Sequence, residues 1–175
     1  MKVINLWGGP GSGKSTTAAG LYYLMKINKF KVELVREFVK DLIWEDSLHL
    51  LKDQNFILMN QNKMLKRLEG KVDYVITDSP LLLSVYYADD EYLLKRPSFK
   101  DFVWEEFNSY NNINIMLDKD HSYESYGRLH NEEEANNISC DLENLLLCNN
   151  LEYYKYKTNI NIANTIMNKI IELES

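Results

Sequence analysis

The sequence predicts an α/β protein of three layers, in which a mostly parallel five-stranded sheet is covered by helices on both faces. Two observations support this fold. Short apolar segments typical of buried strands alternate along the chain with longer segments of helical periodicity. The glycines are few, seven in all, and four of them lie close together just after the first apolar segment. The 175 residues suit one domain, covering 1–175, with a substantial core.

Five segments have the length and apolar composition of buried strands. They are 2–7, 32–35, 73–77, 113–117 and 153–157. Helices are predicted between and after them, at 15–28, 37–46, 54–68, 98–110, 132–147 and 160–173, and a further helix begins within 81–88. Parallel neighbours require crossover connections, which the intervening helices supply, so the alternation favours a parallel sheet.

The composition excludes several classes of protein. Apolar residues make up 45% and charged residues 26% of the chain, as in ordinary globular domains. No apolar run is long enough for a membrane-spanning helix, and the first residues do not resemble a signal peptide, so we expect a cytoplasmic protein. A net charge of −6 argues against a general polyanion binder, although a local basic groove is compatible with it.

The glycine cluster carries the strongest functional signal. Residues 8–15 read GGPGSGKS and match the phosphate-binding pattern G-x-x-x-x-G-K-[ST], with a predicted strand before it and a helix after it. Lys14 is predicted to reach the β- and γ-phosphates of ATP, and the Ser15 hydroxyl to bind Mg²⁺. The residues predicted to bind ATP are Gly9, Pro10, Gly11, Ser12, Gly13, Lys14, Ser15 and Thr16.

Two acidic residues follow predicted strands and are candidates for the rest of the site. Asp78 ends the segment VDYVITD, where open α/β sheets bind ligands, and is predicted to hold Mg²⁺ or to orient an acceptor hydroxyl. Its structural alternative is a helix N-cap. Glu37 follows the second strand and is predicted to accept a proton from an acceptor hydroxyl. The alternative is that Glu37 is an acidic residue in the first turn of a helix, where the helix dipole favours a negative charge.

Further polar residues are candidates for substrate binding. Gln54 and Gln61 lie seven residues apart and share one face of a predicted helix, where amides can read a base or sugar, or simply form a polar stripe. Arg36 and Lys40 flank Glu37 and either bind phosphates or face solvent.

The polar segment 118–131 is predicted to be a lid between a strand and a helix. Its Lys119 and Arg128 are placed to close on the transferring phosphoryl group and to stabilise its charge. The alternative is a surface loop.

Four stretches together resemble small phage P-loop kinases, which include phage 5-hydroxymethyluracil DNA kinases. The stretches are WGGPGSGKSTTAAGLYYLMK, VELVREFVKDLIW, VDYVITDSPLLLS and YGRLHNEEEA, and the resemblance covers about residues 1–135. The chain also resembles, more distantly, thymidylate kinases and nicotinamide-riboside-kinase-like ATPases. The resemblance implies ATP-dependent phosphorylation of a hydroxymethyl base in phage DNA, with Arg128 as the lid arginine. Lys119 stands where a second lid arginine is expected, and Asp78-Ser79-Pro80 replaces the D-R-[YF] pattern of thymidylate kinases.

Three functions remain open from the sequence. The first, which the resemblance favours, is a kinase whose acceptor is the hydroxymethyl group of a base in DNA. A clustered basic patch would support it, with the candidate members Lys63, Lys66, Arg67, Lys95, Arg96 and Lys100. The second is a kinase of a free nucleoside or nucleotide. The third is a nucleotide-dependent switch that hydrolyses ATP without an acceptor. The oligomeric state is not predicted.

Overall fold

A parallel sheet forms the centre of the protein. The computed structural model describes residues 1–119 and 131–174. The five strands lie in the order β2-β3-β1-β4-β5, and every neighbouring pair is parallel. The predicted fold class is therefore confirmed, with a sheet that is parallel throughout. The strands are β1 (Lys2–Trp7), β2 (Val32–Val35), β3 (Tyr74–Thr77), β4 (Asn111–Asp118) and β5 (Tyr153–Lys157).

Helices connect the strands, close to the predicted positions. They are α1 (Lys14–Ile27), α2 (Phe38–Trp44), α3 (Gln54–Lys66), α4 (Leu83–Tyr86), α5 (Asp90–Lys95), α6 (Phe99–Asn108), α7 (Glu132–Cys148) and α8 (Ile162–Glu172), with a 3₁₀ helix η1 (Leu48–Lys52). The sequence did not predict η1 and α5, and the helix expected within 81–88 is a single turn. Within the described ranges, no helix combines the length and the apolar character needed to cross a bilayer.

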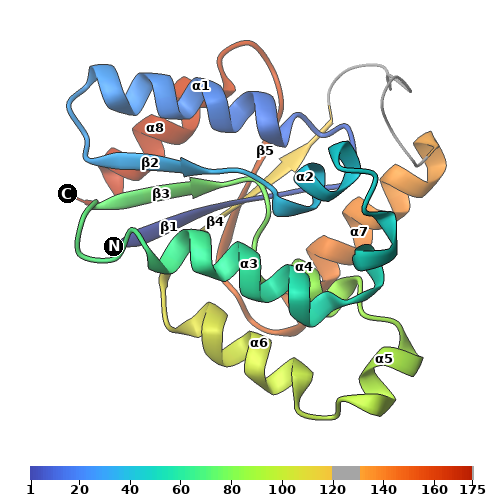
Figure 1. The fold of residues 1–175 in the computed structure, drawn as a ribbon. Helices are drawn as coiled ribbons and strands as arrows, with labels where there is room; N and C mark the ends of the chain where they lie inside the picture. The colour runs from blue at the N-terminus through green and yellow to red at the C-terminus, as the bar shows by residue number, and fades with distance from the viewer. Residues whose placement is uncertain (120–130, 175) are drawn as a thin grey trace.

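Two apolar cores lie on opposite faces of the sheet, as the alternation of side chains along β1 requires. Ile4 and Leu6 pack in the core beneath α1 and α8. Val3 and Trp7 point the other way, into the core shared with α3, α6 and α7. Figure 1 shows α1 and α8 on one side of the sheet and α3, α4 and α6 on the other. This is the predicted three-layer arrangement.

A row of asparagines joins β1 to β4 inside the second core. The Asn5 amide donates hydrogen bonds to Oδ1 of Asn112 at 2.9 Å and to Oδ1 of Asn114 at 3.3 Å. The Trp7 indole N–H also donates to Oδ1 of Asn114, at 3.1 Å. Buried polar groups need such partners, and a slip of one residue would break all three bonds. The row therefore fixes the register in which Asn5 lies opposite Asn114.

The strand order determines what meets at the carboxyl edge of the sheet. β3 lies between β2 and β1, so the residue after β3 has the ends of both neighbouring strands beside it. The loop after β1 is the glycine-rich segment, and Glu37 follows shortly after β2. Ligands of open parallel sheets bind at this edge.

Candidate active site

The phosphate loop joins β1 to α1 and leaves the start of α1 open. Gly13 is the N-cap residue of α1 and has φ 83°, a left-handed conformation that favours glycine. It offers no capping side chain, and the first turn of α1 holds no acidic residue. The first backbone N–H groups of a helix have no partner within it, and the helix dipole adds positive potential there. This end of α1 is therefore suited to bind phosphate.

Two side chains of the loop complete this environment. Nζ of Lys14 donates hydrogen bonds to the carbonyl oxygens of Gly8 at 2.6 Å and Gly9 at 3.0 Å, so the ammonium group lies over the loop. Oγ of Ser12 is buried and makes no hydrogen bond with the residues that the structure describes. Buried hydroxyl groups are normally hydrogen-bonded. The Ser12 hydroxyl inside the loop fits a bound phosphate, to which it would donate a hydrogen bond.

Helix α7 supports the phosphate loop from the side. The Gly9 N–H donates to Oγ of Ser139 at 2.8 Å. A Cβ atom on Gly9 would lie 2.2 Å from the carbonyl oxygen of Ala135 and 2.6 Å from Oγ of Ser139. Gly9 is therefore required by the close approach of two backbones. No local sequence signal indicates this contact, which joins residues 130 positions apart.

We expect Gly9→Ala to lower the free energy of unfolding by about 1–3 kcal/mol, because the methyl group must displace helix backbone. Thermal and denaturant unfolding measure the change. The matched control is Gly20→Ala, in the interior of α1, where the nearest contact of the new Cβ is the Ala163 methyl at 3.3 Å and alanine is favoured by helix propensity. Equal stability of the two variants would contradict the assigned backbone contact.

Asp78 links the three strand ends. Its carboxylate is 4% exposed. Oδ2 accepts a hydrogen bond from the Ser15 hydroxyl at 2.5 Å, and Oδ1 accepts one from the Glu37 N–H at 3.0 Å. Nζ of Lys40 lies 3.6 Å from Oδ2. Asp78 does not cap the next helix, because α4 begins at Leu83. The structure therefore does not support the N-cap alternative for Asp78, and its role toward Mg²⁺ or an acceptor hydroxyl stays a prediction.

Glu37 lies beside Asp78 at the start of α2. It occupies the N-cap position, but its side chain makes no capping hydrogen bond. Partial burial raises the pKa of the Glu37 carboxyl, and the Asp78 carboxylate adds to the increase, whereas the ammonium groups of Lys14 and Lys40 oppose it. The Glu37 carboxylate is therefore close enough to both cations and to the strand-end acid to interact with them electrostatically, and its role as a proton acceptor stays a prediction.

Ser15 and Asp78 form a donor set that fits Mg²⁺. The ion prefers hard oxygen ligands and is commonly bound by one or two carboxylates together with substrate phosphates. The hydroxyl and the carboxylate lie within hydrogen-bonding distance of each other. The described residues contain no cluster of three or more His, Cys, Asp or Glu side chains able to hold a metal. The protein therefore offers part of a coordination shell that nucleotide phosphates would complete.

The side chains of Gln54, Gln61 and Arg36 have their partners outside this site. The Gln61 amide accepts from the Phe38 N–H at 2.9 Å and donates to the carbonyl oxygen of Arg36 at 3.2 Å, so it holds the β2–α2 connection to α3. Gln54 is buried and donates to the Leu51 carbonyl oxygen at 2.9 Å. The exposed Arg36 guanidinium lies 3.9 Å from Oδ1 of Asp41. The amide of Gln61 thus orders the backbone beside Glu37.

The predicted lid falls largely outside the described residues. Arg128 is among those not described, so its role stays a prediction. Asp118 is the last residue of β4, and Nζ of Lys119 bonds to Oε1 of Glu132 in the first turn of α7. The Asn131 side chain caps α7 by accepting from the Glu134 N–H at 2.9 Å.

The candidate basic residues do not form one patch. Lys66 pairs with Glu106 at 2.7 Å and Lys95 with Glu91 at 2.6 Å. The Arg96 guanidinium lies over the ring of Tyr92. The carboxyl end of α3 and the helix α5 lie at opposite ends of the layer below the sheet (Figure 1). The basic side chains are therefore divided between two places and partly neutralised.

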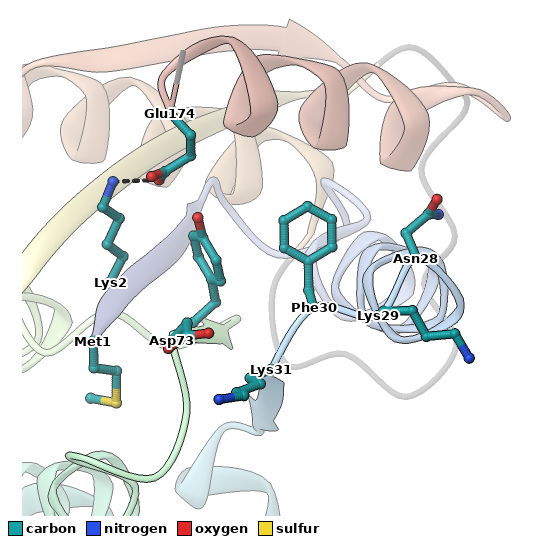
Figure 2. Close-up of a pocket in the computed structure, with 9 residues that line it drawn as sticks. Met1, Lys2, Asn28, Lys29, Phe30, Lys31, Asp73 and Glu174 are labelled. Carbon is teal, nitrogen blue, oxygen red and sulfur yellow. Dashed lines mark hydrogen bonds and ion pairs between the residues drawn. The ribbon is translucent and has the colours of Figure 1, made fainter.

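A hollow of about 650 Å³ lies at the other edge of the sheet and is separate from this site. Figure 2 shows it where β1 and β3 begin, with Lys2 and Glu174 joined by an ion pair across one wall. The phosphate loop follows the other end of β1. The residues that line the hollow are Met1, Lys2, Asn28, Lys29, Phe30, Lys31, Asp73, Tyr74 and Glu174.

The parallel sheet, the phosphate loop and the strand-end acid define a P-loop nucleotide-binding protein. The chain belongs to the AAA domain family, whose model matches residues 3–161. None of the curated proteins matches it.

Two solved structures share the fold along nearly the whole chain. One is deoxyadenosine kinase from M. mycoides with bound dCTP, with a TM-score of 0.65 and 21% identity, covering 98% of this chain and 100% of that one. The other is thymidylate kinase from Ehrlichia chaffeensis, with a TM-score of 0.59 and 17% identity, covering 99% of this chain and 98% of that one. The fold is thus that of nucleoside and nucleotide kinases.

Proposed function

We propose that the protein is an ATP-dependent kinase that phosphorylates a hydroxyl group of a free nucleoside. The observation that carries this proposal is the place of Glu37. Its backbone N–H is bonded to Asp78, which is bonded in turn to Ser15 of the phosphate loop. A carboxylate is thereby held next to the groups that would bind the nucleotide, as a hydroxyl acceptor requires. Transfer to a phosphate acceptor needs no general base.

The proposed reaction assigns a role to each of these groups. The acceptor hydroxyl oxygen bonds to the γ-phosphorus of ATP while its proton passes to the Glu37 carboxylate, and the bond to the β-phosphate oxygen breaks to release ADP. Lys14 and the N–H groups at the start of α1 stabilise charge on the phosphoryl oxygens. Ser15 and Asp78 would hold Mg²⁺, which, when bound, offsets the negative charge of the β- and γ-phosphates.

We favour a free nucleoside over DNA because of the charges on the protein surface. The resemblance to phage 5-hydroxymethyluracil DNA kinases favours a base in DNA, and that acceptor is the second candidate. DNA binding depends on clustered, unpaired cations, because affinity comes from neutralising backbone phosphates. In this chain Lys66 and Lys95 are paired with acids, and the net charge is −6. Similarity in fold to a deoxyadenosine kinase supports the nucleoside acceptor.

The test is transfer of labelled γ-phosphate from ATP with Mg²⁺ to a set of separate acceptors. The set comprises the common deoxynucleosides and ribonucleosides, deoxythymidine monophosphate, thymine DNA and 5-hydroxymethyluracil DNA. We expect label on one or more nucleosides and slow ATP hydrolysis without acceptor, since a kinase completes its closed, water-excluding site only when the acceptor binds. Label only on DNA or only on the monophosphate would replace the proposed acceptor. Rapid hydrolysis with no labelled product would instead support the nucleotide-dependent switch.

A further inference from the structure

Three side-chain oxygen atoms of the candidate site surround the ammonium group of Lys40. Nζ donates a hydrogen bond to Oγ of Ser15 at 2.6 Å. It lies 3.6 Å from Oδ2 of Asp78 and 3.8 Å from Oε2 of Glu37. Ser15 and Asp78 are the two residues that fit Mg²⁺. The cation of Lys40 therefore lies against both protein ligands of the metal position.

The burial of Asp78 explains why a cation is held there. A buried carboxylate is costly unless it is paired with an opposite charge and hydrogen-bonded. The Ser15 hydroxyl and the Glu37 N–H supply neutral donors, and Lys40 supplies the positive charge. The Lys40 side chain is 45% exposed, whereas that of Asp78 is 4% exposed. The ammonium group thus reaches a buried acid from the solvent side, on a flexible stem that can turn outward while α2 stays in place.

A divalent cation and this ammonium group compete for the same oxygens. At separations of about 4 Å two positive ions repel each other strongly near a protein surface. One hydroxyl and one carboxylate form a small part of a Mg²⁺ coordination shell, and the remaining ligands must be water or phosphate. A free ion gains little from the site while Lys40 is there, but an ion bound to nucleotide phosphates brings its own ligands and negative charge.

We propose that Lys40 is a resident counter-ion that keeps the metal position closed to free divalent cations, and that it leaves when the cation arrives together with nucleotide phosphates. The inference rests on the proposed function only in assigning Ser15 and Asp78 to the metal. It also gives the spacing of Glu37 and Lys40 a purpose, because one turn of α2 places the proposed base and the counter-ion on the same side.

The probe is Mn²⁺ alone, titrated without nucleotide and followed by the paramagnetic resonance signal of the free ion. We expect weak binding to the unaltered protein and at least about tenfold tighter binding to Lys40→Met, because a positive charge near the ion is removed. Lys40→Arg keeps the charge and is expected to bind weakly. Lys63→Met is the matched control, since Lys63 is exposed on α3 away from the phosphate loop, and it should leave Mn²⁺ binding unchanged.

A second readout is the stability of the same proteins. Added Mn²⁺ should raise the Tm of Lys40→Met more than that of the unaltered protein, because an ion that binds only the folded state stabilises it by an amount that grows with the logarithm of its affinity. Lys40→Gln serves where Lys40→Met folds poorly. The double variant Lys40→Met/Asp78→Asn should lose the gain in Mn²⁺ affinity.

Equal Mn²⁺ affinity of Lys40→Met and the unaltered protein would overturn the counter-ion role, as would a gain that survives Asp78→Asn. Neither measurement depends on phosphoryl transfer. A failed acceptor assay with the expected Mn²⁺ result would reject the proposed kinase and keep the counter-ion. The opposite pair of results would keep the kinase and reject the counter-ion.

Discussion

Lys14→Ala is expected to lower the rate of phosphoryl transfer by about 10²–10³-fold or more while the protein stays folded, because it removes a positioned donor to the phosphoryl oxygens. The Lys14 ammonium group bonds to the Gly8 and Gly9 carbonyl oxygens at the surface of the loop. It lies outside both apolar cores, so its removal leaves the packing of β1 and α1 in place. The measurements are initial rates with the acceptor found by labelling, and thermal unfolding of the variant.

The matched control for this variant is Lys63→Ala, which removes an equal charge from an exposed position of α3. It should retain the rate and the Tm of the unaltered protein. ATP binding measured by calorimetry should weaken in Lys14→Ala and stay unchanged in the control. Unchanged turnover of Lys14→Ala would remove the basis for a P-loop kinase altogether.

Glu37→Gln is expected to lower turnover by about 10²–10⁴-fold, the usual contribution of a general base. Glutamine keeps the size of the side chain and the backbone N–H that bonds to Asp78. ATP affinity should therefore change much less than turnover. The assay compares turnover at saturating acceptor with ATP binding measured separately.

Glu45→Gln is the control for Glu37→Gln, because Glu45 is an exposed acid at the other end of α2. It should behave as the unaltered protein does. Turnover of Glu37→Gln within a few-fold of normal would assign Glu37 to helix initiation alone. The phosphate loop and Asp78 would then keep their proposed roles in transfer.

The sequence predicts the phosphate loop and the strands well because both are local patterns. Gly13 shows this most clearly: a left-handed residue between a buried strand and a helix is required by the loop itself. The beginning of β4 was less predictable. Asn111 and Asn112 have the composition of a loop, yet both belong to the strand, because the Asn112 side chain has its partner on Asn5, more than one hundred residues away.

The side chains of the site divide in the same way. Asp78 and Glu37 are predictable as strand-end acids, but their contact depends on β3 lying between β1 and β2, which no local pattern specifies. Periodicity correctly places Gln61 on a buried helix face. Whether its amide faces a substrate or the backbone depends on the path of Arg36 and Phe38, which bind it. The sequence offers Arg36 and Lys40 as equal candidates for binding phosphate. Only the fold distinguishes them, because Lys40 lies beside Asp78 whereas Arg36 is exposed next to Asp41.

The contact between Gly9 and α7 limits which hybrid proteins can be made by recombining this chain with a relative. A loop from one parent and a helix from another will fit only where the residue opposite Gly9 is small and offers a hydroxyl, as Ser139 does. Crossover points placed between residues 9 and 139 separate these partners and should give a high proportion of defective hybrids. Crossovers after α7 keep these two partners together.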